Sequence, residues 1–495
     1  MSEVFLKVTN INKAFAGVQA LKDVNLTINK GEICCLAGEN GSGKSTLIKI
    51  IAGAYKPDDG EIEINGKKYN TITPMDTIRE GIQIIYQDFS IFPNLTAAEN
   101  IALNSELAKN KKLVNWKNVY DTAKKAIEKI NVEIDLDARV VELSVADKQL
   151  IAISRALLQN AKLIIMDEPT TALTKKEIDS LFKVIDGLRQ QGISILFVSH
   201  KIEEVFALAE KITILRNGEN VISDDVKNFD RAKFIYYMTG REFNETYYEA
   251  RHTSKEPVMK VENIGKKGSF ADISFELHSG EILGITGLLG SGRTELALAL
   301  FGRDVIDTGK IIMEGKEIRL RNVKQAIRHG IGYVPEDRLT EGLFLSQSIA
   351  RNTVASVIDR MKGKFAFLSR SKMKDIVGHW VGDLKIKTAN VDNPVQTLSG
   401  GNQQRVVLAK WLATKPKVLI LNGPTVGVDI GSKKDIHDIL RRLSDDGMAI
   451  VIISDDIPEV LNNCNRVLIM RRGRIVGEFG GKSLTEDMLA QKLTS

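Results

Sequence analysis

A glycine-rich loop near the start of the chain has the residue types needed to bind the phosphates of a nucleoside triphosphate. Residues 38–46 fit the pattern G-x-x-x-x-G-K-[ST], in which glycines let backbone N–H groups close around phosphate oxygens. Lys44 can reach the β- and γ-phosphates, and the hydroxyl of Ser45 can coordinate Mg²⁺. The alternative is a glycine-rich turn without a ligand. The residues expected to bind nucleotide are Gly38, Glu39, Asn40, Gly41, Ser42, Gly43, Lys44, Ser45 and Thr46.

Two adjacent acids, Asp167 and Glu168, supply a second set of reactive groups. They follow the apolar run Leu163–Met166, which is typical of a buried strand, and ligands bind at strand ends in open parallel sheets. We expect Asp167 to hold Mg²⁺, directly or through water, and Glu168 to accept a proton from the attacking water or to polarise it. The alternative is that both acids cap the next helix. His200 follows the apolar run 196–198 and Ser199, and would contact the γ-phosphate; the alternative is a structural histidine.

The elements that must position these groups are strands that alternate with helices. The apolar run 32–37 before the loop is predicted as a strand, and residues 47–52 after it as a helix that Gly53 stops. The run 193–198 is predicted as a further strand. Such alternation implies an α/β fold with a mostly parallel sheet that helices cover on both sides. The β-rich start (4–64) and the charged middle (88–142) predict a β-rich and a helical subdomain.

The sequence contains a second copy of this pattern. A shift of 249 residues carries Gly38 onto Gly287 and Gln87 onto Glu336, and a shift of 255 residues carries Ser144 onto Ser399. Six extra residues therefore lie in the second copy between Glu336 and Ser399. Internal repetition of this length indicates two copies of one domain. The predicted parts are domain 1 (1–240), a linker (241–256) and domain 2 (257–495).

The second copy differs from the first at almost every reactive position. Arg293 replaces the loop lysine and keeps the positive charge, although its planar group is larger. Asn422 and Gly423 replace the acidic pair, and Asp455 replaces the histidine. We expect weak or altered nucleotide binding and little hydrolysis here, unless another acid such as Glu336 substitutes. The residues of this altered loop are Gly287, Gly290, Gly292, Arg293 and Thr294.

Composition is that of a globular protein with two or more domains. The chain has 495 residues, 43% hydrophobic and 27% charged, and its net charge of +6 comes from interspersed bases and acids. This balance gives no argument for a nucleic-acid partner. The three cysteines, Cys34, Cys35 and Cys464, form no metal-binding spacing, and we expect reduced thiols. Neither a signal-sequence core nor a membrane-spanning run is present, so we expect a cytoplasmic chain whose membrane role would need a partner.

The order of these motifs resembles that of ABC-type ATPases. The glycine loop, Gln87, Leu143–Ser144, the acidic pair and His200 follow one another as they do in that family. Two such domains in one chain of about this length resemble the ATP-binding subunits of bacterial simple-sugar importers of the ribose, galactose and xylose type. Matching segments extend over nearly the whole chain, at residues 238–242, 330–338, 398–404 and 425–433.

The resemblance implies two tandem P-loop NTPase domains, ATP and Mg²⁺ as cofactors, and hydrolysis of ATP to ADP and phosphate. It implies that Gln87 contacts Mg²⁺ or the attacking water and responds to a transmembrane partner. Phe15 occupies the position of the aromatic residue that stacks on adenine in the family; the alternative is a core residue.

The family also pairs the glycine loop of one domain with the signature segment of another. Ser399, Gly400 and Gly401 are close to the family's signature and can offer a hydroxyl and N–H groups at a helix start to a γ-phosphate. The first copy has Ser144 followed by the bulkier residues 145–146, which hinder such an approach. The first copy therefore keeps the loop lysine and the acidic pair but has an altered signature segment. The second copy keeps the signature segment but has an altered loop and no acidic pair. Head-to-tail pairing would give one complete site and one degenerate site, which includes Ser144.

The implied partners are transmembrane permease subunits, expected as a dimer, and, indirectly, an extracytoplasmic solute-binding protein. The permease would dock near the helical middle and Gln87, which places the chain on the cytoplasmic face of the inner membrane as a peripheral subunit. Alternatives are a soluble tandem ATPase that acts on ribosomes and a regulatory ATP-binding protein, although the former usually has a long charged linker and two intact sites. The sequence leaves the solute open among ribose, galactose, xylose, arabinose, a polyol, a nucleoside and a signalling furanose.

Overall fold

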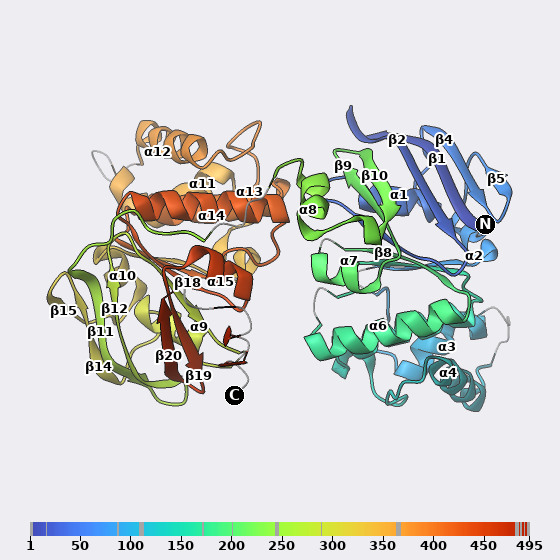
Figure 1. Ribbon diagram of the computed structural model, residues 1–495, viewed down its shortest axis with the longest axis horizontal. Helices are drawn as coiled ribbons and strands as arrows, with labels where there is room; N and C mark the ends of the chain where they lie inside the picture. The colour runs from blue at the N-terminus through green and yellow to red at the C-terminus, as the bar shows by residue number, and fades with distance from the viewer. Residues whose placement is uncertain are drawn as a thin grey trace. The chain divides into compact units, whose positions relative to one another are not determined.

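The computed structural model describes residues 3–15, 17–86, 89–107, 113–170, 173–199, 201–242, 247–288, 290–362, 368–480, 485, 488–489 and 491–492. The chain divides into unit 1 (Met1–Phe243) and unit 2 (Asn244–Ser495). Each unit has a six-stranded sheet, a four-stranded sheet and flanking helices (Figure 1). The predicted tandem α/β fold is therefore confirmed. Among the described residues, no helix has both the length and the apolar character needed to cross a membrane.

The main sheet of unit 1 places the ends of its strands around the glycine loop. Its order is β10-β9-β3-β8-β7-β6, in which only β10 is antiparallel to its neighbour. β3 and β8 are buried along their whole length, as expected for central strands with helices on both faces. The strands are β3 (Ile33–Ala37), β6 (Ile82–Ile85), β7 (Leu163–Asp167), β8 (Ser194–Val198), β9 (Lys211–Arg216) and β10 (Glu219–Asp225).

An antiparallel sheet of order β2-β1-β4-β5 packs against the main sheet through a shared core. This core includes Phe5 and Leu26 from the antiparallel sheet, Leu47 from the helix after the glycine loop, and Leu36 from β3. The loop is therefore held between two packed layers. The strands are β1 (Val4–Phe15), β2 (Val18–Asn29), β4 (Asp59–Ile64) and β5 (Lys67–Tyr69).

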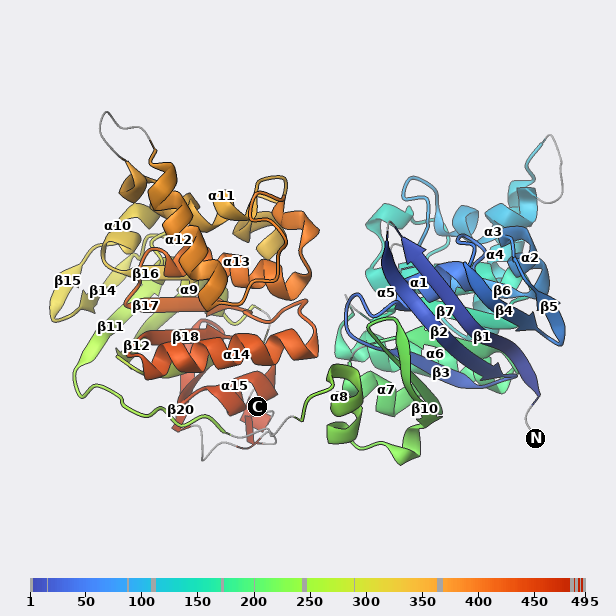
Figure 2. The ribbon, with the colours of Figure 1, turned by 90° about the horizontal axis from the view of Figure 1, so that it is seen from above.

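The helices of unit 1 form two groups. α3 and α4 lie next to each other and, with α5, enclose a separate small core around Ile101 and Ala123 (Figure 2). This group is the predicted helical subdomain, and the other helices flank the sheets. The helices are α1 (Lys44–Ile51), α2 (Pro74–Glu80), α3 (Ala97–Leu107), α4 (Trp116–Ile130), α5 (Val145–Leu158), α6 (Lys175–Gln190), α7 (Ile202–Leu208) and α8 (Arg231–Thr239).

Unit 2 repeats this arrangement, with sheets of order β16-β17-β18-β13-β19-β20 and β12-β11-β14-β15. The strands are β11 (Pro257–Lys266), β12 (Phe270–His278), β13 (Ile282–Thr286), β14 (Thr308–Met313), β15 (Lys316–Ile318), β16 (Ile331–Val334), β17 (Val418–Asn422), β18 (Ala449–Ile453), β19 (Arg466–Arg471) and β20 (Arg474–Gly480). The helices are α9 (Arg293–Leu300), α10 (Val323–Arg328), α11 (Ile349–Val354), α12 (Arg370–Asp383), α13 (Gly400–Leu412), α14 (Ile430–Asp445) and α15 (Ile457–Asn463).

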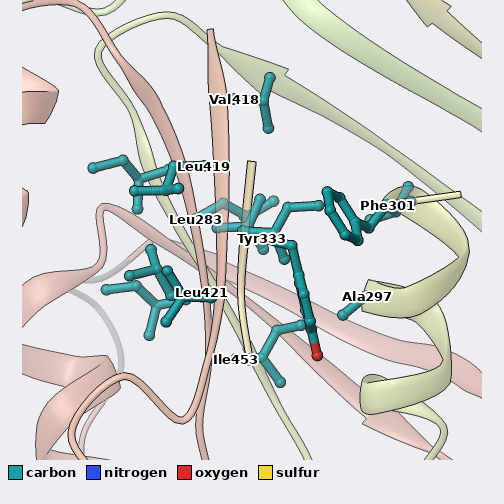
Figure 3. Packing of buried hydrophobic residues seen from close by; sticks show 14 of the residues in the cluster. Leu283, Ala297, Phe301, Tyr333, Val418, Leu419, Leu421 and Ile453 are labelled. Atoms are coloured by element: carbon teal, nitrogen blue, oxygen red, sulfur yellow. The ribbon is translucent and has the colours of Figure 1, made fainter. Parts of the chain in front are cut away.

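Aromatic rings join α9 to the main sheet of unit 2. The ring of Phe301, directly after α9, stacks on that of Tyr333 in β16 with 5.1 Å between centroids. Trp411 of α13 meets Phe301 edge-on at 5.2 Å. Figure 3 shows Phe301 and Tyr333 together with Ala297 beside the strands. This packing fixes the carboxyl end of α9 against the sheet.

The extra residues of unit 2 lie partly in a turn after β16. In unit 1, Asn100 is buried and hydrogen-bonds both the N–H and the C=O of Phe92; in unit 2, Asn352 does the same with Phe344. These pairs match at a shift of 252 residues, so three of the six extra residues precede Phe344. The same stretch contains a five-residue π-helical turn, Arg338–Gly342, that unit 1 does not have among its described residues.

Part of the predicted linker packs onto unit 2. Tyr248 is 8% exposed, its N–H donates to the carbonyl of Asn462, and its hydroxyl donates to Asp445 at 2.7 Å. Further along, the N–H of Ser254 donates to the carbonyl of Ser279. We call residues 247–254 the strap.

Candidate functional site

The glycine loop of unit 1 connects β3 to α1 and surrounds the ammonium group of its lysine. Nζ of Lys44 donates to the carbonyls of Gly38 at 2.7 Å and Glu39 at 2.8 Å. Burial lowers the pKa of Lys44, whereas the negative charges of Glu168 and Asp167 oppose that shift. These interactions join the glycine loop and the acidic pair into one site.

Two glycines of the loop are required by its shape. Gly43, before α1, has φ +103°, and a Cβ there would lie 2.8 Å from the carbonyl oxygen of Ala20. Gly38 has φ +154°, and a Cβ there would lie 2.3 Å from the carbonyl oxygen of Leu215. The buried hydroxyl of Ser42 has no hydrogen-bond partner within the described part of the chain. A cradle that excludes side chains, contains a lysine and retains an unpaired hydroxyl fits the phosphates of a nucleotide.

The acidic pair lies at the carboxyl end of β7. Burial raises the pKa of Asp167, the charge of Glu168 raises it further, and Lys44 lowers it. Burial and the charge of Glu168 both disfavour the ionised form of Asp167, so a divalent cation beside the pair would be favourable. Mg²⁺ is commonly bound by one or two carboxylates together with phosphate oxygens. The hydroxyl of Thr174 caps α6, so neither acid is its N-cap and the alternative role of the pair as helix caps is wrong.

The other predicted residues of unit 1 that the structure describes include exposed residues of the glycine loop and of the end of β1. Ser45 is exposed at the start of α1, as are Asn40 and Gly41 in the loop. Phe15 ends β1 with 40% of its surface exposed, so it is not a core residue, and its ring meets that of Tyr55 edge-on at 5.3 Å. Gln87 and His200 lie outside the described residues.

In unit 2 the loop arginine is neutralised within the unit. Arg293 is 9% exposed and donates to the carbonyl of Gly287 at 2.5 Å, which matches the bond from Lys44 to Gly38. Its guanidinium also forms an ion pair with Asp455 at 3.3 Å. The residue that replaces the histidine therefore faces the residue that replaces the lysine.

The remaining replacements in unit 2 contact one another weakly. Nδ2 of Asn422 lies 3.4 Å from the hydroxyl of Thr294 and 3.5 Å from Oε2 of Glu336. Asn422 is an amide that donates to both neighbours, so the position of Asp167 carries no negative charge in unit 2, and the nearby carboxylate is that of Glu336. Gly423 has φ +56°, close to the φ +48° of Glu168.

The two signature serines differ in what their hydroxyls do. The hydroxyl of Ser144 donates to a carboxylate oxygen of Asp147 at 2.7 Å and accepts from its N–H at 3.1 Å. The hydroxyl of Ser399 instead accepts from Nδ2 of Asn402 at 3.0 Å and makes no such capping bond. Ser144 is thus committed to its own helix, whereas the O–H of Ser399 is kept as a donor.

The signature glycines of unit 2 also serve packing. Gly401 is buried, and a Cβ there would lie 2.2 Å from Oγ of Ser432 in α14. Gly400 borders Arg338, whose guanidinium donates to the carbonyls of Val426 at 2.7 Å and Gly427 at 3.0 Å. Sequence analysis included Arg338 only as the last residue of the matching segment 330–338 and gave it no role.

Known proteins resemble this chain either over about half of its length or over nearly all of it. A solved ADP conformation of an ATP-binding cassette of an ABC transporter is similar to 48% of this chain and 94% of that chain, with 27% identity and a TM-score of 0.43. The ribose import ATP-binding protein RbsA of Bacillus subtilis (strain 168) is 39% identical over 484 residues, 98% of each chain. The protein of the same name from Clostridium perfringens (strain 13 / Type A) is 40% identical over 487 residues, 98% of this chain and 97% of its own. The ABC transporter family matches the chain twice, over residues 21–171 and 270–426. The chain therefore belongs to the ABC transporter family and carries that family's domain in two copies.

Proposed function

We propose that this chain is the ATPase that energises import of a monosaccharide, with ribose the first candidate, through a membrane permease. The observation that carries this function is the similarity over 98% of the chain to proteins named for ribose import. That name favours a transport ATPase over an ATPase that acts on ribosomes or a regulatory ATP-binding protein. A nucleoside or signalling-furanose importer is the nearest alternative.

Hydrolysis requires positioning and charge stabilisation more than covalent chemistry. Lys44 and the N–H groups of the glycine loop would bind the β- and γ-phosphates. Ser45 and Asp167 would hold Mg²⁺, which supplies charge stabilisation on the phosphate oxygens. Glu168 would accept a proton from the attacking water, with Gln87 and His200 as further contacts to the water and the γ-phosphate.

One complete site would form from groups of both units. Unit 1 supplies the lysine and the acidic pair, and unit 2 supplies Ser399 and Gly400. The hydrogen bonds of the two serines support this division, because only Ser399 keeps its O–H for a phosphate oxygen. The second site would combine Arg293 with Ser144, and both are engaged within their own units.

A groove in unit 1 is suited to the permease. A cavity of about 300 Å³ lies between the main sheet and the helical subdomain, lined by Ile78, Gln83, Ile84, Ile85, Ser90, Phe92, Asn104, Ala152, Arg155, Ala156 and Gln159. Ile78 is 46% and Phe92 51% exposed, and Nε2 of Gln83 has no partner among the described residues. An apolar rim with an unpaired donor fits a helix end of a permease dimer. The chain would then be peripheral on the cytoplasmic face of the inner membrane, and a solute-binding protein would reach it only through the permease.

Lys44→Ala and Glu168→Gln should each lower ATP hydrolysis by the assembled complex about a hundredfold or more, because they remove phosphate binding and the proton acceptor. Arg293→Ala is the matched control in unit 2 and should keep most of the activity. Phosphate release by the reconstituted complex, with and without ribose and its binding protein, measures both effects. Substantial turnover by Glu168→Gln would contradict the one-site model, and ribose-independent activity across a sugar panel would contradict ribose as the solute.

Ser399→Ala should lower kcat about tenfold or more, because it removes one donor to the γ-phosphate. Ser144→Ala should leave turnover within about twofold, since the hydroxyl of Ser144 is bound to Asp147. Steady-state hydrolysis by the two variants decides between the arrangements. Equal losses in both would mean that the two sites contribute alike.

Asp455→Ala should tighten nucleotide binding to unit 2 about threefold, because it removes a negative charge, on a side chain that is 72% exposed, from beside Arg293. Equilibrium binding of a non-hydrolysable ATP analogue with Mg²⁺, measured on a Lys44→Ala chain, reports mainly unit 2. Asp446→Ala makes the same charge change at an exposed position outside the loop and should leave the affinity unchanged. No difference between the two variants would show that the Arg293–Asp455 pair does not limit binding.

Ile78→Asp should abolish the stimulation of ATP hydrolysis by the permease while leaving ATP binding by the isolated chain unchanged, because a charge would be buried in the groove. Leu113→Asp places the same charge at an 85%-exposed position outside the groove and serves as the control. Co-purification with the permease and stimulated hydrolysis are the measurements. Normal stimulation of Ile78→Asp would exclude the groove as the docking site.

A further inference from the structure

A buried glutamate in unit 1 joins two segments that carry the candidate site. Glu204, in the first turn of α7, is 6% exposed. One of its carboxylate oxygens accepts a hydrogen bond from the hydroxyl of Thr170 at 2.5 Å, and the other accepts from the hydroxyl of Ser199 at 2.8 Å. Thr170 is two residues after Glu168, and Ser199 is directly before His200. We call these contacts the Glu204 bridge.

The bridge is charge-compensated inside the unit. Nζ of Lys201 lies 3.0 Å from Oε1 of Glu204 and donates to the carbonyl of Thr170 at 3.2 Å. The N–H of Lys201 also donates to the hydroxyl of Ser199 at 3.1 Å. A buried carboxylate with both oxygens hydrogen-bonded and a cation beside it is a stable arrangement, and removal of one partner disturbs the others.

The backbone of Glu168 needs support of this kind. Its φ of +48° lies in the left-handed region, which is unfavourable for a residue with a side chain. Such conformations persist when the surroundings determine them from more than one side. The N–H of Glu168 donates to the carbonyl of Val198 at 3.1 Å, which holds one side of the turn. The hydrogen bond from Thr170 to Glu204 holds the other side of the turn, two residues after Glu168.

Unit 2 has the same contacts around a residue that needs no such support. Glu459 accepts from Thr425 at 2.8 Å and Ser454 at 2.5 Å, and Nε2 of His437 takes the place of the lysine at 2.8 Å. The residue that corresponds to Glu168 is Gly423, for which a positive φ is unstrained. Unit 2 therefore contains a matched control for the structural contribution of the bridge.

We propose that Glu204 is a positioning residue for hydrolysis: it fixes the carboxylate of Glu168 relative to the segment that begins at Ser199. This inference rests on the proposed function of the chain as an ATPase. Nucleotide binding depends on the loop around Lys44, which Glu204 does not contact among the described interactions. Loss of the bridge should therefore change turnover far more than affinity.

Glu204→Gln in the assembled transporter should lower kcat at least tenfold and leave the KM for ATP within about threefold. Thr170→Val removes one hydroxyl of the bridge and should have a similar effect, and the double variant should lose no more than the larger single loss. Glu459→Gln, the control, should keep kcat within about threefold while lowering the thermal midpoint of unit 2. If Glu204→Gln does not fold, Thr170→Val alone tests the proposal.

Three results would overturn the proposal: wild-type kcat in Thr170→Val and Glu204→Gln, strictly additive losses in the double variant, or an equal loss of kcat in Glu459→Gln. The same assay separates this proposal from the proposed function. If the wild-type complex hydrolyses ATP and Glu168→Gln does not, the function as an ATPase stands whatever Glu204 does. If the wild-type complex itself shows no hydrolysis, the proposed function fails, and the proposal for Glu204 fails with it.

Discussion

A buried cation in a glycine loop has to be balanced by nearby anions and dipoles, and both units are arranged around that requirement. In unit 1 the ammonium of Lys44 is held by two loop carbonyls, and the charges of Asp167 and Glu168 favour its protonated form. This balance is compatible with binding of a nucleotide together with Mg²⁺, because the negative charges of the phosphates and the positive charge of the metal largely cancel each other. The strand order brings these groups together, because β3 and β7 are both neighbours of β8.

Unit 2 meets the same requirement with an acidic side chain of its own. The guanidinium of Arg293 is matched by Asp455, and Asn422 carries no charge beside Thr294. The replacements are therefore consistent with one another: where the acidic pair is lost, an acid reappears at the histidine position. A loop whose arginine is paired with an acid of its own unit can remain folded.

The sequence predicted the parts of the structure that depend on local pattern. Apolar runs between polar segments identified β3, β7 and β8, and the spacing of glycines identified both loops. Contacts between side chains distant in sequence could not be read this way. Nothing in the pattern shows that the hydroxyl of Ser144 is bound by Asp147 rather than left as a donor, or that Glu204 reaches Thr170 and Ser199, because a buried polar group selects its partner from the whole fold. The contacts of Arg338 could not be predicted for a similar reason, since a matching segment shows likeness to a family but not which groups a side chain contacts.

The strap limits the length of chain that separates the two units. Since residues 247–254 belong to unit 2 by their hydrogen bonds, only residues 243–246 separate Glu242 of unit 1 from the strap. Five peptide steps span at most about 18 Å. One covalent chain also keeps the loop with Lys44 and the loop with Arg293 at a ratio of one to one in every molecule. Covalent stoichiometry of this kind allows the sequences of the two halves to diverge, because each half is always made together with the other.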